Sequence, residues 1–517
     1  MAILANISNL FDADRPLRSA ALLLAVAVCG PSLWLLVEYA QILRLRRKMP
    51  PGPFPLPLVG NFFSIPKVKP WIAWEKLSHK YGSPMVTLWN GHRPIIVCND
   101  IWCISDLLDK RANIYSSRPH FVVMGDMMNQ SEANQVCQVY GDRWRLHRRL
   151  THTAVGTQVV KKHRDAQANE SKVLALHLME DPDNFELAVE RYSTSVVSML
   201  GWGRRIDKIN DPVGQVALAF MEGVDFVVPG LYIMEAIPWL AKLPGWLYPL
   251  PSKILSGTKL MQKYFTALSR EGATAQEDNF SKRLIAAQNE DGLKDEDVAC
   301  LTANLIGGGV DTTSSSILTF ILAMCVFPEA QNKAHEELDS VVGRERSPNW
   351  SDEDNLPYIK AAISEALRWR TDTSITGNMW AIHRHPREFP EPDVYRPERF
   401  LNGLERPYPN KKGHNAFGWG RRQCSGQPLA EQGLYITISR LLWAFEIRPG
   451  LDDMGNEEPL DIFAYTKSEN MRPEKFKARF IPRSEKIAEL IRSEATAALE
   501  DLGSFAGETK VTMQSVM

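Results

Sequence analysis

The sequence predicts a mainly α-helical protein with small β-sheets, preceded by one N-terminal transmembrane helix. Apolar residues recur at helical spacing through most of the chain after residue 60. Two short runs of strand-forming residues, Met85–Trp89 and Pro94–Val97, are the β candidates. Ala20–Val37 contains no charged residue. Because 44% of the 517 residues are hydrophobic and 23% are charged, the chain can bury a large core.

Charge and cysteine content exclude two classes of protein. A formal net charge of −1 argues against nucleic-acid binding, which normally shows an excess of basic residues. The number of cysteines, seven, is odd, which argues against a framework of paired disulfides. Their spacing also does not match that of a metal site. A reducing compartment around most of the chain is therefore expected.

Ala20–Val37 is predicted to be an uncleaved membrane anchor that follows a short lumenal N-terminus, residues 1–19. Its 18 residues would span about 27 Å as a helix, close to the roughly 30 Å hydrocarbon core of a bilayer. Gly30-Pro31 interrupts the run, which membrane helices tolerate. A cleaved signal peptide is the alternative, but its basic residues would precede the apolar run. Here two aspartates cancel the two arginines that precede the run, and the basic cluster follows it. The positive-inside rule places this cluster in the cytosol: Arg44, Arg46, Arg47 and Lys48.

Residues 44–60 form a basic flank and a proline-rich hinge. The segment Pro50-Pro-Gly-Pro-Phe-Pro-Leu-Pro-Leu-Val-Gly60 has enough prolines to keep the backbone extended and stiff, and it ends the preceding helix. At the other end of the chain, residues 492–517 are polar and are predicted to be a loose tail.

Trp144 and Arg148 stand four residues apart in a predicted helix, so both project from one face. The indole N–H and the guanidinium can then bind one anion together. Arg145 and Arg149 would face away. They would form either a basic patch for an acidic redox partner or an ordinary solvated surface, together with Lys411, Lys412 and Arg421.

Asp295–Val326 is predicted to be one long, mostly apolar helix that ends before Pro328. Its middle contains Gly307-Gly-Gly-Val-Asp311-Thr312, and each glycine destabilises a helix by roughly 1 kcal/mol relative to alanine. The missing side chains would leave space for a ligand above a flat cofactor, with an acid and a hydroxyl beside it. The alternative is a helix kink with a capping aspartate.

Glu365 and Arg368 lie on one helix face at i,i+3. Such pairs are usually exposed and contribute only a few tenths of a kcal/mol. A second arginine, Arg399, follows in Pro397-Glu-Arg399-Phe400.

The segment Phe417-Gly-Trp-Gly420-Arg-Arg422-Gln-Cys424-Ser-Gly426 is predicted to hold a cysteine thiolate. Its glycines would let the backbone pass close to a flat ligand. The run from Pro428 has helical spacing, so Cys424 would lie just ahead of a helix N-terminus, which favours the thiolate, and Arg422 would add a nearby cation. A thiolate held in this way can ligate haem iron. The alternative is a buried structural cysteine.

Five positions of this segment match the signature Phe-x-x-Gly-x-Arg-x-Cys-x-Gly, so it closely resembles the haem-binding loop of the cytochrome P-450 family: Phe417, Gly420, Arg422, Cys424 and Gly426. The three upstream motifs occur in the family's order, and the resemblance covers about residues 50 to 490. It implies a cytochrome P-450 fold, with a haem-thiolate monooxygenase domain at residues 61–491. The membrane-anchored microsomal type, and filamentous-fungal members in particular, are the most similar.

The resemblance assigns a role to each motif. Cys424 would be the axial ligand to the iron of haem b (iron protoporphyrin IX). Asp311 and Thr312 would be catalytic, delivering protons to the oxygen that the haem activates. The haem propionates would be bound by Trp144, Arg148 and Arg422. A buried network that supports the haem-binding loop would be formed by Glu365, Arg368 and Arg399.

The same resemblance implies partners and a location. Electrons would come from NADPH through a separate flavoprotein reductase, since the sequence shows no flavin or dinucleotide fingerprint, with cytochrome b5 as an optional second donor. The substrate would be a lipophilic small molecule, and no nucleic acid would bind. The protein would cross the endoplasmic reticulum membrane once, with its catalytic domain facing the cytosol. Tailoring of secondary metabolites is a common role of fungal members.

One segment departs from the family pattern. Only 30 residues separate Arg368 from Arg399, roughly half the usual number, and the residues between Arg370 and Gly377 stand where a strand along the haem would be expected. The alternative function is therefore a degenerate protein that binds haem without turnover. An isomerase or dehydratase of the same fold is disfavoured, because the acid and hydroxyl of the long helix are both present.

Three apolar, methionine-rich segments are the candidates for a substrate pocket. They are Phe121–Met128, residues 224–247 and Phe463–Met471. Their composition suggests an adaptable pocket for a lipophilic and fairly bulky molecule.

Overall fold

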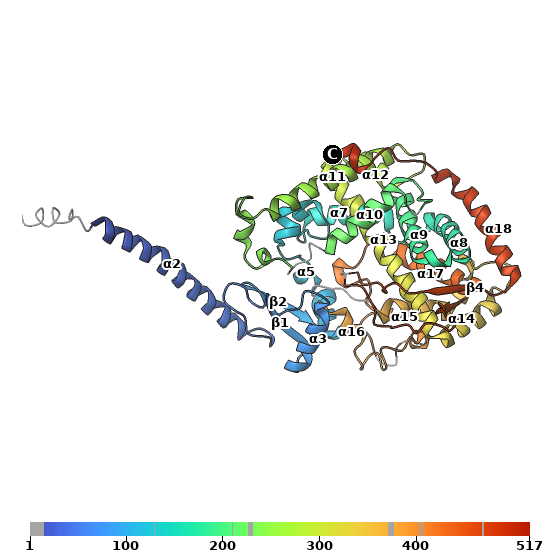
Figure 1. Ribbon diagram of the computed structural model, residues 1–517, viewed down its shortest axis with the longest axis horizontal. Helices are drawn as coiled ribbons and strands as arrows, with labels where there is room; N and C mark the ends of the chain where they lie inside the picture. The colour runs from blue at the N-terminus through green and yellow to red at the C-terminus, as the bar shows by residue number, and fades with distance from the viewer. Residues whose placement is uncertain are drawn as a thin grey trace, which may run out of the picture.

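Helices make up most of the part of the chain that the structure describes (Figure 1). The computed structural model describes residues 15–517 apart from 129, 209, 226–230, 371–376, 403, 405–406 and 468–469. The first elements are α2 (Arg15–Arg46), α3 (Pro70–Tyr81), β1 (Met85–Asn90), β2 (Arg93–Cys98), α4 (Ile101–Ser105), α5 (Ala112–Tyr115), α6 (Gln130–Ala133), α7 (Asp142–Val155), α8 (Arg164–Glu180), α9 (Phe185–Trp202), α10 (Pro212–Asp225), α11 (Leu250–Ala273) and α12 (Phe280–Ala287). They are followed by α13 (Asp295–Val326), α14 (Pro328–Val341), α15 (Pro357–Trp369), α16 (Met379–His383), α17 (Gln427–Ala444), β3 (Phe445–Pro449), β4 (Ala478–Pro482), α18 (Glu485–Asp501) and α19 (Met513–Val516).

The strands form two small antiparallel sheets, which confirms the predicted class of mainly α with small β-sheets. β1 pairs with β2 in a register that sets Met85 opposite Cys98 and Leu88 opposite Ile95. The predicted strands Met85–Trp89 and Pro94–Val97 lie within this hairpin. β3 pairs with β4 in the second sheet. Two-stranded sheets are marginal alone, so both depend on the helices against which they pack.

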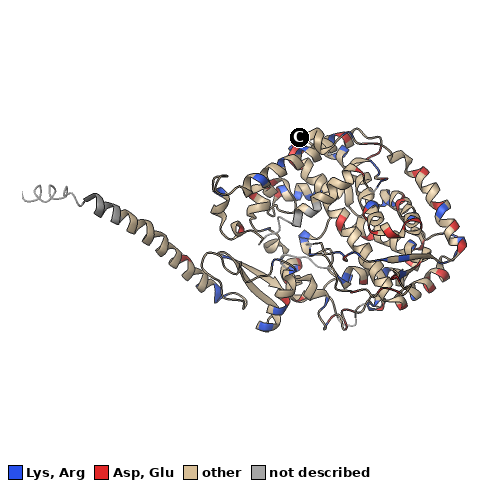
Figure 2. Cartoon of the chain, viewed as in Figure 1, with Lys and Arg blue, Asp and Glu red and all other residues tan. Residues whose placement is uncertain are grey.

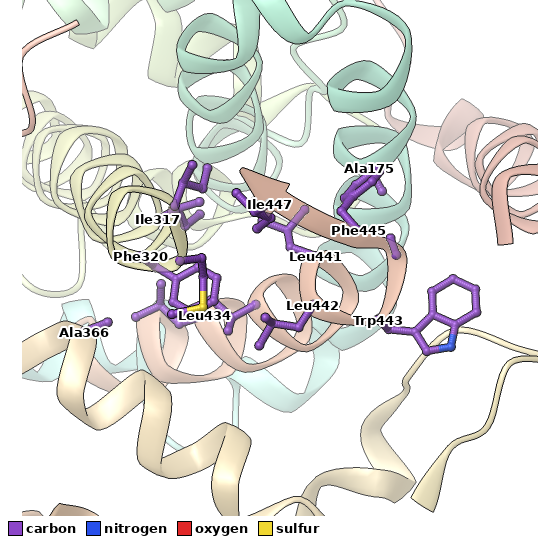
Figure 3. Close-up of a cluster of buried hydrophobic side chains, with 14 of the residues drawn as sticks. Ala175, Ile317, Phe320, Ala366, Leu434, Leu441, Leu442, Trp443, Phe445 and Ile447 are labelled. Carbon is purple, nitrogen blue, oxygen red and sulfur yellow. The ribbon is translucent and has the colours of Figure 1, made fainter. Parts of the chain in front are cut away.

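The core of the body is built around α13 and α17. Figure 3 shows side chains from α13, α15, α17 and β3 gathered in one buried cluster, among them Phe320, Ala366, Leu434 and Ile447. Every residue of α17 from Gln432 to Ala444 is buried. A helix that is covered on all sides belongs in the interior of a large domain. The middle of α13 and the loop that leads into α17 are therefore held in fixed positions relative to one another.

α2 projects from the body as a separate helix (Figure 1). Its segment Leu23–Arg46 has a mean hydropathy of 1.7 and none of its apolar window is buried, so it is a candidate transmembrane helix. The helix continues through Pro31, where an interruption was expected. Arg44 and Arg46 lie in its last turn, at the end next to the body (Figure 2). α13 is also long and apolar enough to cross a membrane, but 67% of its apolar window is buried inside the body.

The proline-rich segment is bound to both α2 and the first sheet. Tyr39 Oη donates to the carbonyl oxygen of Pro55 at 2.9 Å, and Thr87 Oγ1 of β1 donates to that of Pro50 at 2.8 Å. A Cβ atom at Gly52 would overlap the carbonyl oxygen of Thr87. The segment therefore fixes where α2 leaves the body.

The prediction of a loose C-terminal tail is wrong. α18 runs to Asp501 and packs against α8 through a buried face formed by Ile487, Ile491, Ala495 and Ala498. These residues have the spacing of an amphipathic helix. The prediction missed this spacing because it used only the polar composition of the segment.

The chain after α18 also packs against the body. Val511 is buried in a cluster that includes Phe265 of α11. Lys510 N donates to a carboxylate oxygen of Glu271, at the end of α11, at 2.7 Å. A short polar segment is ordered here because a few apolar side chains and backbone groups find partners on helices distant in sequence.

Candidate functional site

A cavity of about 510 Å³ is lined by α7, α9, α13, α15, α17 and the loop before α17. It brings together seven of the residues singled out in the sequence: Trp144, Arg148, Thr312, Phe417, Arg422, Cys424 and Gly426. Other predicted residues do not line it: Asp311, Glu365, Arg368, Arg399 and Gly420. Residues from three of the four motifs therefore line one cavity, while the fourth motif, which contains Glu365 and Arg368, does not line it.

Cys424 lies in a tight loop immediately before α17. Its backbone N–H donates to the carbonyl oxygen of Phe417 at 2.9 Å, which closes the loop. Gly426 is the N-cap residue of α17, and proline occupies the first turn, as predicted. The Cys424 side chain is exposed where it faces the cavity.

Gly420 has a different role from the one expected. It adopts a left-handed φ of +54°, and a Cβ atom there would overlap the carbonyl oxygen of Leu108. Its N–H also donates to Asp109 Oδ1 at 2.8 Å. Gly420 thus allows the loop to pack closely on the helical turn Asp106–Lys110, and not on a flat ligand.

Although the Cys424 side chain is exposed to the cavity, the protein atoms around the cavity desolvate the thiol and raise its pKa. Hydrogen bonds from the backbone of Gly426 and Gln427 and the charge of Arg148 act in the opposite direction. A coordinated metal would favour the thiolate, because a coordinating thiol is deprotonated. The neighbouring cation is Arg148, where Arg422 was expected.

Three arginines lie on the cavity wall near Trp144: Arg118, Arg148 and Arg422. Arg148 Nη1 donates to Ser425 Oγ at 2.6 Å, and Arg118 Nε donates to the carbonyl oxygen of Val136 at 3.2 Å. None of the three pairs with a carboxylate of the described residues. A wall with three such cations suits a ligand that carries more than one negative charge, as the two propionates of haem do.

Arg422 uses its donors chiefly to anchor the loop. Its Nε, Nη1 and Nη2 donate to the carbonyl oxygens of Ser116, Gln135 and Gln138 at 2.7, 3.1 and 2.6 Å. Its guanidinium lies 4.7 Å from the centre of the Trp144 ring. Burial, with the charges of Arg118 and Arg148, lowers the pKa of Arg422 to about 10. Arg118 carried no sequence signal, since it is a lone arginine in a short loop.

α13 has the predicted bounds and places Thr312 on the cavity. Thr312 Oγ1 donates to the carbonyl oxygen of Gly308 at 2.5 Å, so its lone pairs remain available to a ligand. The glycines differ in their roles. A Cβ atom at Gly308 would meet no atom within 4 Å, whereas one at Gly309 would overlap Val197 of α9. Gly308 leaves space in the cavity, and Gly309 allows close helix packing.

Glu365, Arg368 and Arg399 meet in a buried network behind the cavity. Arg368 Nε and Nη2 bind both oxygens of Glu365 at 2.7 and 2.8 Å, and both side chains are fully buried. Arg399 Nε lies 3.4 Å from Glu365 Oε1. The sequence-derived expectation of a buried network, against the usual exposed pair, agrees with this geometry.

His383 connects this network to the cysteine loop, and sequence reasoning missed it. Arg368 Nη1 donates to the His383 carbonyl oxygen at 2.8 Å, and His383 Nε2 accepts from Asn415 N at 2.9 Å. Burial, with the charges of His414 and Arg368, holds the pKa of His383 well below its usual range, so the ring is neutral and can accept. Asn415 is two residues before Phe417, where the loop begins.

The substrate-pocket expectation needs correction. Phe121–Met128 does not line the cavity. Its residues Val122 and Val123 pack in a separate cluster with Met234. Of Phe463–Met471, Asn470 and Met471 line the cavity. Residues 226–230 of the candidate segment 224–247 lie outside the described residues, as do residues 371–376 of the short segment.

Comparisons with known proteins identify what the chain is similar to. A family model described as "Cytochrome P450" matches residues 50–373 and 370–471, and its two parts meet at the short segment. The chain is 30% identical over 518 residues to "Cytochrome P450 monooxygenase 226" of Postia placenta, covering 94% of this chain and 98% of that protein. It is 31% identical over 527 residues to "Cytochrome P450 monooxygenase fogE" of Aspergillus ruber, covering 93% and 95%.

Solved structures include a neighbour with the same fold. The structure titled "Zebra fish cytochrome P450 another structure with Abiraterone" aligns with a TM-score of 0.64 at 23% identity. The alignment covers 80% of this chain and 100% of that chain.

Proposed function

Because this chain belongs to the cytochrome P450 family of monooxygenases, we propose that it is a haem-thiolate enzyme that inserts one oxygen atom from O₂ into a lipophilic small molecule. The observation that carries the proposal is the convergence on one cavity of the Cys424 thiol, the Thr312 hydroxyl and three arginines that form no ion pair with a carboxylate of the described residues. The similarity to fungal monooxygenases supports a tailoring step in fungal secondary metabolism as its role.

The chain's own residues fit haem b. Cys424 would ligate the iron, and Trp144, Arg148 and Arg118 would bind the propionates. Arg422 would hold the loop against residues 116–138. When bound, haem supplies the iron that activates molecular oxygen. Glu365, Arg368 and Arg399 would support the loop through His383.

The Thr312 hydroxyl would hold a proton at the cavity. Asp311, the residue before it, would supply that proton. Thr312→Ala is expected to retain haem but to lower the product formed per NADPH by about tenfold or more, because the hydroxyl that positions the proton is removed. Product and hydrogen peroxide would be measured together with NADPH consumption.

Thr312→Ser is the matched control, since it keeps the hydroxyl. It should restore most of the coupling. If Thr312→Ala gave as much product per NADPH as the wild type, the proposed role would be wrong.

Electrons would come from NADPH through a separate flavoprotein reductase, with cytochrome b5 as an optional second donor. The expected basic docking patch is less charged than the sequence suggested. Arg145 pairs with Asp142, Arg149 pairs with Asp291, and Lys412 pairs with Glu431. These contacts favour the alternative of an ordinary solvated surface for those three side chains.

The alternative of a degenerate haem-binding protein has no support from the comparisons. Relatives named as monooxygenases match over about nine tenths of this chain. The residues between Arg370 and Gly377, which motivated the alternative, lie outside the described residues. After this segment the chain continues in defined structure, because Gly377 pairs with Cys98 and Asn378 caps α16.

α2 supports a single-pass location in the endoplasmic reticulum membrane with the body in the cytosol. Exposed Trp239 and Trp246 on the body agree with a position near a bilayer. The body contains four Asn-x-Ser acceptor sequences for N-glycosylation, at Asn129, Asn169, Asn279 and Asn349. They are poor reporters of topology, because Asn169 and Asn279 are buried in the fold.

Appended acceptor sequences test this topology. In microsomes, an acceptor sequence added before Met1 should be glycosylated, and the same sequence added after Met517 should not. The basic residues that follow the apolar run would hold the body in the cytosol. A mobility shift that endoglycosidase removes is the measurement. Glycosylation after Met517 would contradict the proposed orientation.

A further inference from the structure

Arg370 is a buried cation on the cavity wall, and neither haem binding nor the proposed proton delivery gives it a role. It directly follows α15, is 4% exposed, and lines the cavity. Its guanidinium lies 4.2 Å from the centre of the Trp369 ring and 4.8 Å from that of Phe463. Aromatic rings near a guanidinium fix its plane, so its hydrogen bonds must be made at its edges.

The edges of Arg370 are only partly used. Nε donates to the carbonyl oxygen of Ile462 at 3.0 Å. Nη1 donates to the carbonyl oxygen of Trp369 at 3.0 Å and to Asp393 Oδ1 at 3.3 Å. Nη2 is buried and has no hydrogen-bond partner among the described residues. A buried charged donor without an acceptor is unfavourable, so an acceptor from a ligand would relieve a real cost.

The local charge balance is positive. Arg370 shares Asp393 with Arg384, just as Arg368 and Arg399 share Glu365. Four guanidinium groups thus depend on two carboxylates. Burial lowers the pKa of Arg370 to about 10, which leaves it charged at neutral pH.

A second unpartnered donor lines the same cavity. Ser315 of α13 is 7% exposed, and its Oγ has no hydrogen-bond partner among the described residues. α9 and α13 also contribute apolar side chains to the wall, among them Val197, Leu301 and Leu305, interspersed with polar ones such as Asn304 and Thr313. Figure 1 shows α15 in the lower part of the body and α7, which carries Trp144 and Arg148, in the upper part.

We propose that Arg370 binds a carboxylate of the substrate, so that the substrate class is a lipophilic carboxylic acid. The inference rests on the proposed monooxygenase function and narrows its substrate. The free Nη2 edge makes a charge-assisted hydrogen bond to the acid. The Ser315 hydroxyl, which lines the same cavity, adds a neutral one, and the apolar body of the substrate lies against the apolar side chains of α9 and α13. Arg370 is then a specificity-determining residue.

Matched acid and ester probes test the proposal. The haem-loaded protein is titrated with straight-chain saturated fatty acids from octanoate to hexadecanoate and with the corresponding methyl esters at neutral pH. Binding is measured by equilibrium dialysis, which requires no turnover. The best acid should bind about tenfold or more tightly than its ester, because only the acid pairs with the guanidinium.

Variants identify the group responsible. Arg370→Met should remove the preference by weakening the acid and leaving the ester unchanged, and Arg370→Lys should keep part of it. Arg384→Gln is the matched control: it shares Asp393 but does not line the cavity, so it should keep the preference. If Arg370→Met does not fold, Arg370→Gln replaces it.

Three results would overturn the inference. They are the absence of an acid preference at every chain length, a preference that survives removal of Arg370, and loss of haem without change in the acid-to-ester ratio. The last result would assign Arg370 to a haem propionate. Arg370-dependent acid binding in a protein that forms no product would instead refute the monooxygenase proposal and leave the binding site intact.

Discussion

Replacement of Cys424 by alanine is expected to abolish thiolate ligation and all monooxygenase activity. Cys424 is the cysteine that lines the cavity, and the loop closed by its bond to Phe417 aims it there. The reduced carbon-monoxide complex of the wild type should show the strongly red-shifted absorption of a thiolate ligand. The Cys424→Ala protein should lack that absorption, and product formation should fall below detection.

Cys300→Ala provides a matched control on α13. Burial raises the pKa of the Cys300 thiol to about 12, and it does not line the cavity, so it should be inert. This variant should keep the red-shifted spectrum. A wild-type spectrum in Cys424→Ala would refute the assignment of the axial ligand.

Arg368→Met is expected to destabilise the body by about 3–5 kcal/mol, because it leaves the Glu365 carboxylate buried and poorly compensated. The change also removes the donor to the His383 carbonyl oxygen, so haem should be lost more readily. Urea unfolding followed by circular dichroism, together with haem content, would measure both effects.

An exposed ion pair serves as the comparison. Arg270 binds Asp295 at 2.7 Å, and the two side chains are 62% and 45% exposed, so Arg270→Met should cost less than about 1 kcal/mol. Adding Glu365→Gln to Arg368→Met should recover part of the stability, since the buried charge is then removed. Equal effects of Arg270→Met and Arg368→Met would show that the network does not support the body.

The elements that could be predicted from the sequence are those whose signals are local. α13 has the predicted bounds because a long apolar run between an acidic start and Pro328 specifies a helix by itself. The β1–β2 hairpin follows from two strand-forming runs separated by a short turn. The cysteine loop is likewise encoded within ten consecutive residues, which is why its placement before a helix N-terminus could be predicted.

The predictions that were wrong concern contacts between distant segments. Gly420 packs against Leu108, and the C-terminal segment packs against α8 and α11. Neither partner could be chosen from composition.

By itself, the sequence determined the family, the candidate anchor, the long helix and the cysteine that faces the cavity, because each is a pattern over adjacent residues. Only the tertiary structure decided which charges surround that cysteine. Arg422 binds the carbonyl oxygen of Gln138, 284 residues away, so Arg148 acts on the thiol in its place. Arg118 and Arg370 reach the cavity walls for the same reason: a guanidinium is positioned by the backbone carbonyls and aromatic rings packed around it, and folding alone brings those together.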